Sequence, residues 1–131
     1  MKNLPTRLNF TGLSRLAALA TVSLLATGCA PTVKTVPLTI QSDPMGAYVL
    51  FQVQADRKDV RSYDWVYIGN TPLKTRRSVL KSELEDADAF IVRVMKEGYL
   101  DQEKAYTGQQ MVSEAKSKGT VFWNPRLVPV N

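Results

Sequence analysis

Ala89-Phe90-Ile91-Val92-Arg93-Val94-Met95-Lys96 is the stretch of sequence that decides the fold. One phenylalanine and two valines occupy every second position, which is the period of a half-buried β-strand. Glu97-Gly98 follows as a turn, and 99–106 returns as the next strand. The centre of the chain therefore predicts a pair of antiparallel strands.

Three further strands are visible upstream. A strand of period two is expected over 36–41, and another over 47–54 has Val49, Phe51 and Val53 on one side. A shorter strand over 65–68 ends in a turn from which 73–77 leads away. The turns carry proline and glycine, which supply the fixed φ or the positive φ that tight turns need. We expect structural turn residues at five positions: Pro44, Gly46, Gly69, Pro72 and Gly98.

The C-terminal part is less regular. Residues 109–118 form either a short helix or a loop, and Glu114 and Lys118 are spaced for an i,i+4 ion pair. A buried run over 121–123 is followed by two prolines that restrict 127–130 to an edge position. The mature chain predicts an all-β domain of antiparallel strands, with at most this one short helix.

The N-terminus predicts an exported precursor. The first 15 residues hold three basic residues and no acid, as is typical of a segment that stays on the cytoplasmic side during export. The apolar run over 16–25 is shorter than the roughly 20 residues that a spanning helix needs. Small residues over 26–28 then precede Cys29, the only cysteine. This pattern predicts a helical signal peptide over 1–28 that is cleaved before Cys29.

Leu24-Leu25-Ala26-Thr27-Gly28-Cys29 resembles the lipobox of bacterial lipoproteins, although Ala26 stands where leucine is commonest. The resemblance implies a diacylglycerol on the Cys29 sulfur and an acyl chain, such as palmitate, on its amino end. Two or more such chains anchor a protein stably. Ala30, in place of aspartate, implies sorting to the outer membrane, with the domain facing the periplasm. The alternative is an ordinary signal peptide, cut after Gly28 or Ala30, that leaves a free thiol.

The chain divides into a signal peptide over 1–28, a lipidated N-terminus and tether over 29–37, and a single domain over 38–131. Removing the signal takes away three of the 17 basic residues and none of the 12 acidic ones, which leaves 14 against 12. A nucleic-acid partner would need clustered basic residues and stacking aromatics on one face. The mature chain therefore predicts no nucleic-acid partner.

Three motifs in order resemble the signatures of the PEGA domain. They read Ser-Asp-Pro-Met-Gly-Ala-Tyr-Val over 42–49, Tyr-Ile-Gly-Asn-Thr-Pro-Leu over 67–73, and Val-Arg-Val-Met-Lys-Glu-Gly-Tyr over 92–99. Met45 departs from the family's usual glutamate, and a charged insertion over 56–64 separates the first two motifs. The resemblance implies a small β-sandwich on surface or envelope proteins, without established catalysis.

The chain is poor in catalytic groups. It has no histidine, which excludes histidine-based triads, imidazole general bases and histidine metal sites. Four acids over 82–88 (Glu83, Glu85, Asp86 and Asp88) offer carboxylate oxygens for Ca²⁺, but a solvated connection explains them as well. We expect no enzyme activity, no metal and no cofactor beyond the lipid on Cys29.

Aromatic residues give the best binding hypothesis. Tyr63, Trp65 and Tyr67 alternate along one expected strand face, next to the insertion. Flat rings of this kind anchor protein interfaces or stack on sugars. We expect a module that contacts an envelope protein through these aromatics and three basic residues of the insertion: Arg57, Lys58 and Arg61. The alternative is binding of envelope polysaccharide or peptidoglycan through the aromatics.

Overall fold

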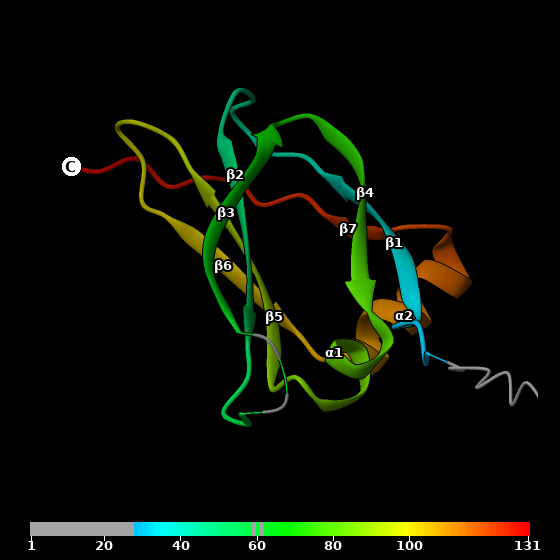
Figure 1. The fold of residues 1–131 in the computed structure, drawn as a ribbon. Helices are drawn as coiled ribbons and strands as arrows, with labels where there is room; N and C mark the ends of the chain where they lie inside the picture. Colours follow the sequence, from blue (N-terminus) through cyan, green and yellow to red (C-terminus); the bar gives the residue numbers. More distant parts are fainter. Residues whose placement is uncertain (1–27, 59, 61) are drawn as a thin grey trace, which may run out of the picture.

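The computed structural model describes residues 28–58, 60 and 62–131, which form two packed β-sheets with two short helices at one end (Figure 1). The first sheet has the order β4-β1-β7 and the second the order β3-β2-β5-β6. The strand bounds are Val33–Ile40 (β1), Tyr48–Gln54 (β2), Tyr63–Asn70 (β3), Leu73–Leu80 (β4), Ala89–Met95 (β5), Gln102–Tyr106 (β6) and Val121–Trp123 (β7). The helices are Lys81–Asp86 (α1) and Gly108–Lys118 (α2). The expected small all-β domain is confirmed.

The core lies between the two sheets and follows the period of two read from the sequence. On β2 the buried residues are Val49, Phe51 and Val53, and the register sets them opposite the valines and the phenylalanine of the stretch over 89–96. All six of these side chains are at most 1% exposed. Burial of each stabilises the fold by about 1.5–3 kcal/mol relative to exposure. The stretch that decides the fold is thus one of the two inner strands of the larger sheet.

Three features of the fold differ from the sequence expectations. β7 pairs with β1 in parallel, so the sandwich is not wholly antiparallel. β1 begins at Val33, three residues before the expected start of this strand at Val36. The acidic segment over 81–86 is a helix rather than an irregular connection. The helix expected as one alternative over 109–118 is present as α2.

A hydrogen-bonded corner joins the two sheets at Thr71, between β3 and β4. The Thr71 hydroxyl lies 2.6 Å from the hydroxyl of Ser42 and accepts from the backbone N–H of Ala47 at 3.0 Å. The Thr71 backbone bonds the same turn twice, donating to the carbonyl of Ala47 and accepting from the N–H of Gly46. Ser42 donates to the carbonyl of Pro44 at 2.8 Å, so the proton between the two hydroxyls belongs to Thr71. The first two sequence motifs therefore bind each other.

The predicted turn glycines adopt positive φ angles. Gly46 has φ +85° and Gly98 has φ +80°, both in the left-handed region that glycine favours. Gly69 has φ +141° and lies inside β3, where the pairing with β2 shifts register. Pro44 and Pro72 both lie at the corner around Thr71, one in each turn.

The C-terminal segment crosses the ends of both sheets rather than forming an edge strand. Leu127 donates its N–H to the carbonyl of Asp43, and the N–H of Leu100 bonds the carbonyl of Val128. The stretch over 127–130 makes only isolated bridges. It thereby ties the turn after β1 to the turn after β5.

The two ends of the sandwich are formed by different segments of the chain. β1 enters at the end that also holds residues 55–58 and the start of both helices (Figure 1). The backbone confirms this proximity, because the N–H of Lys81 in α1 donates to the carbonyl of Thr32 at 2.8 Å. We name this the N-terminal end. The corner at Thr71 and the C-terminal segment lie at the opposite end.

Replacing Thr71 with valine tests the corner. Thr71→Val keeps the shape but removes the hydroxyl, leaving the N–H of Ala47 without its side-chain acceptor and Ser42 without a donor. We expect the free energy of unfolding to fall by about 2 kcal/mol in urea titration, because an unsatisfied buried polar group costs about 1–3 kcal/mol.

Thr71→Ser and Thr39→Val are the controls. Thr71→Ser keeps the hydroxyl and should recover most of the stability. The Thr39 hydroxyl makes one partly buried bond to Thr120, so its loss should cost less than Thr71→Val. Equal losses for the two valine variants would contradict a special role for the corner.

Candidate functional site: an uncovered sheet face

The outer face of the larger sheet carries aromatic and apolar side chains that no other described element covers, because the smaller sheet and both helices lie on the other side (Figure 1). The register builds this face in rows. One row across the sheet runs from Tyr67 through Leu50 and Arg93 to Glu103, one residue from each strand. We name this surface the outer face and define it by six residues: Tyr48, Leu50, Trp65, Tyr67, Arg93 and Glu103.

Arg93 organises the centre of the outer face. Its guanidinium lies 4.0 Å from the ring centroid of Trp65 on β3, a cation–π contact. The same guanidinium donates from Nε to Oε1 of Glu103 on β6 at 2.6 Å. One side chain therefore links the two edge strands across the sheet. Held by both contacts, Arg93 and Trp65 form a pre-ordered pair at the surface.

A shift in strand register separates the three predicted aromatics. The pairing of β2 with β3 is irregular between Phe51 and Val53, and Tyr63 is paired with the core residue Val53. The Tyr63 hydroxyl donates to Oε1 of Glu83 at 2.8 Å, and Glu83 is only 2% exposed. The expected single face of three aromatics is therefore wrong: Tyr63 belongs to the inner side.

A second tyrosine that the sequence interpretation did not include belongs to the outer face. Tyr48 is 55% exposed and Tyr67 is 57% exposed, and their rings meet edge to face at 6.1 Å between centroids. The signal was available, since Tyr48 alternates with the buried Val49 on β2. Arg93 could likewise be read as outward-facing between Val92 and Val94, but its contact with Trp65 depends on strand order.

Two of the three predicted basic residues of the insertion, Arg57 and Lys58, lie away from the outer face. Arg57 forms an ion pair with Asp86 of α1 at 3.4 Å, at the N-terminal end, and Lys58 is exposed in the same loop. Arg61 lies outside the described residues. The loop is held further by Val60, which is 6% exposed, and by the Ser62 hydroxyl, which donates to the carbonyl of Val53. The first described part of the insertion is thus linked to α1 through Arg57.

The four predicted acids near α1 share no partner with one another. Glu83 accepts from Tyr63 and from the backbone N–H of Leu80. Glu85 pairs with Lys81, Asp86 with Arg57, and Asp88 accepts from the N–H of Asp56. Within residues 28–58, 60 and 62–131, no three potential metal ligands converge. Asp86 and Asp88 thereby link the C-terminal end of α1 to Arg57 and Asp56 of the insertion.

Cys29 is exposed as a free cysteine at the N-terminal end of the described chain. It precedes β1 by four residues, so the tether between them is only Ala30 to Thr32. The signal peptide expected over 1–28 falls, but for Gly28, outside the described residues. In the part of the chain that the structure does describe, no helix is long and apolar enough to cross a membrane.

No family model, no curated protein and no solved structure matches this chain.

Tyr106 provides a test of burial beside α2. Its side chain is 3% exposed, and its hydroxyl has no hydrogen-bond partner in the described residues. Burial raises the pKa of the Tyr106 phenol far above its ordinary value of about 10, and the Glu114 carboxylate raises it further. Above pH about 10 the unfolded chain releases the phenol proton of Tyr106, whereas the native state keeps it. The contribution of Tyr106 to the free energy of unfolding is therefore fully present below pH about 10 and is lost as the pH rises further.

Tyr106→Phe should leave the free energy of unfolding at pH 7 unchanged or raise it by up to about 1 kcal/mol, because no hydrogen bond is lost. It should also make the decline in stability above pH about 10 shallower than in the parent protein. Urea titrations at pH 7 and pH 10.5 measure both effects, with the surface variant Tyr48→Phe as the control. A large loss of stability at pH 7 would show that the hydroxyl has a partner.

Proposed function

We propose that this protein is a lipid-anchored, non-catalytic binding module of the bacterial cell envelope, which holds a partner protein through the outer face. The lipobox resemblance at Cys29 is the basis for the anchor and for placement at the outer membrane, facing the periplasm. The PEGA resemblance suggests a binding or assembly domain. The observation that carries the proposal is the uncovered outer face, where an ordered Trp–Arg pair adjoins two exposed tyrosines.

The composition of the outer face fits a protein interface. Trp, Tyr and Arg are the residues most enriched among energetic anchors of protein complexes. Leu50 lies between Tyr67 and Arg93 in the register and supplies an apolar centre, while Glu103 supplies a polar rim. Because Arg93 and Trp65 are already ordered, binding would cost little side-chain entropy there.

Glycan binding is the second candidate, and the geometry favours it less. Stacking on a sugar needs free, flat ring faces in a series along the surface. Arg93 covers one face of the Trp65 ring, Tyr63 is bonded to Glu83 on the inner side, and Tyr67 makes an edge contact with Tyr48. Tyr67 alone remains as an exposed member of the predicted series.

Photo-crosslinking in intact cells tests the outer face. A photo-reactive phenylalanine at Tyr67 should give a discrete protein adduct, identified by mass spectrometry. The matched control is the same probe at Phe122, an aromatic position on the smaller sheet that is 41% exposed. Adducts to glycan alone would favour the second candidate. Equal yields of the same adducts at both positions would contradict the outer face as the contact.

The anchor is tested separately. Cys29→Ser should abolish incorporation of a fatty-acid probe and release the domain from the membrane fraction, because the acylated sulfur is replaced. Ser78→Ala, at an exposed position on β4 of the otherwise unchanged chain, is the labelling control and should incorporate the probe like the parent protein. Unchanged labelling of Cys29→Ser would contradict the lipid anchor while leaving the outer face untouched.

A further inference from the structure

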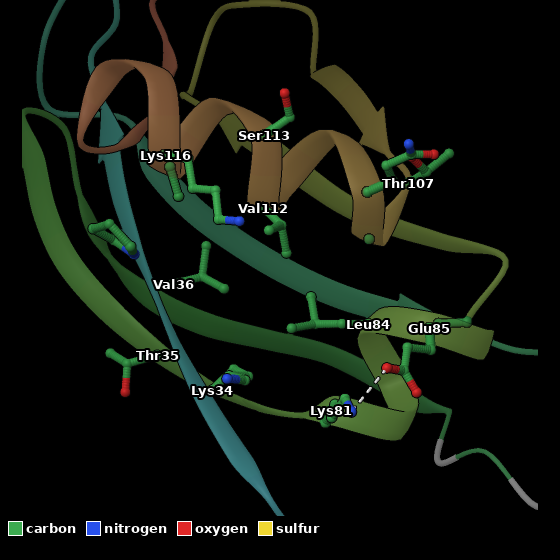
Figure 2. Close-up of a pocket in the computed structure, with 15 residues that line it drawn as sticks. Lys34, Thr35, Val36, Lys81, Leu84, Glu85, Thr107, Val112, Ser113 and Lys116 are labelled. Atoms are coloured by element: carbon green, nitrogen blue, oxygen red, sulfur yellow. Dashed lines mark ion pairs between the residues drawn. The ribbon is translucent and has the colours of Figure 1, made fainter.

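A large open hollow lies at the N-terminal end, between β1, α1 and α2 (Figure 2). Its volume is about 1,070 Å³. β7 pairs with β1 only over Leu38–Ile40, so the preceding part of β1 borders the hollow along its edge facing α2. The floor and walls are largely apolar: Val36, Pro37, Leu84, Ala87, Val112 and Ala115.

The two helices fix the shape of the hollow. α2 starts against α1 at Gly108, where an added Cβ would lie 1.8 Å from the carbonyl oxygen of Leu84. Only glycine allows this approach, because any side chain would overlap the backbone of α1. The N-terminus of α2 is capped by Thr107, whose hydroxyl accepts from the N–H of Gln110. The hollow is thus bounded by a close helix contact rather than by loops.

Lysines surround the apolar floor. Lys34 comes from β1, Lys81 from α1 and Lys116 from α2, and Figure 2 shows Lys116 extending beneath α2 on the side that faces Val36. The single acid in the lining, Glu85, pairs with Lys81 at 3.4 Å. Neither Lys34 nor Lys116 has an ion-pair partner among the described residues. The lining therefore has two positive charges in excess, next to an apolar surface.

The hollow lies close to the lipid attachment point that the proposed function assigns. Val33, the first residue of β1, is four residues from Cys29, which limits the separation to about 14 Å in a fully extended chain. Val33 is itself 53% exposed, and Val112 at the hollow is 37% exposed. A lipid on Cys29 would hold this end of the sandwich at the membrane surface, where the effective concentration of lipid head groups is high.

We propose that the hollow binds an anionic phospholipid of the membrane in which the protein is anchored. Lys34 and Lys116 contact the phosphate, and the apolar floor around Val36 and Leu84 covers the upper part of an acyl chain. This inference rests on the proposed lipid anchor. Paired basic and apolar surfaces of this kind are complementary to a lipid, whose charged head group adjoins its hydrocarbon. Docking would orient the sandwich with its N-terminal end on the bilayer.

The experiment uses the purified full-length gene product in vesicles that contain a photo-activatable phosphatidylglycerol, with photo-activatable phosphatidylcholine as the comparison. Mass spectrometry of the Cys29 peptide first records whether that residue is acylated. Mapping of the lipid adducts then gives the result for the hollow. We expect adducts on the segments 33–37 and 112–116, at least about tenfold more abundant with the anionic lipid.

Lys34→Gln/Lys116→Gln should lower the anionic adducts at the hollow by about tenfold or more. The matched control, Lys74→Gln/Arg76→Gln, removes the same two charges from exposed positions on β4 that do not line the hollow. Equal losses in both double variants would overturn a specific site, as would adducts spread evenly over the surface. Loss of the adducts on adding inorganic phosphate at constant ionic strength would assign the site to free phosphate instead.

The two proposals can fail independently. Acylated Cys29 without adducts at the hollow would overturn this inference and leave the anchor standing. Adducts at the hollow with an unmodified Cys29 would support the lipid site and contradict the anchor. Absence of both acylation and adducts would overturn the anchor and the lipid site together.

Discussion

The hydroxyl of Thr71 is the constraint on which the sandwich depends, because it fixes where the chain passes from one sheet to the other. β3 and β4 follow each other directly but lie in different sheets, so the turn between them must be held at a defined angle. Thr71 does this by bonding Ser42 and Ala47 of the turn that makes the same passage from β1 to β2. The two turns that connect the sheets thus share one group of buried hydrogen bonds, which fixes the position of one sheet relative to the other.

Period-two patterning predicted most of the strands because it is a local signal. The stretch over 89–96 and the alternation over 47–54 needed no knowledge of their partners, and both are strands of the expected kind. The helix over 108–118 could be anticipated from its ion-pair spacing. Strand order, the parallel pairing of β7 and the early start of β1 depend on contacts between distant segments, which no local pattern encodes.

The candidate site shows the same division between local and distant information. That Trp65 and Tyr67 share a side of β3 follows from their spacing, but Tyr63 should have joined them by the same rule. One extra residue in β3 relative to β2 reverses its direction, and the carboxylate of Glu83 then satisfies its hydroxyl on the inner side. The acids around α1 were visible in the sequence as a cluster. Only the fold shows that each one has a separate partner.

The two surfaces of interest lie in positions that do not compete. The outer face runs along the side of the larger sheet, whereas the lysine-lined hollow opens beside the entry of β1, at the N-terminal end. If Cys29 carries lipid, a tether of three residues leaves the domain little freedom to turn away from the bilayer. Contact of the hollow with lipid would remove much of the remaining rotational freedom of the domain. The outer face would then point along the membrane surface and not lie against it. A partner could therefore reach Tyr48, Trp65 and Tyr67 while the lipid contact is maintained.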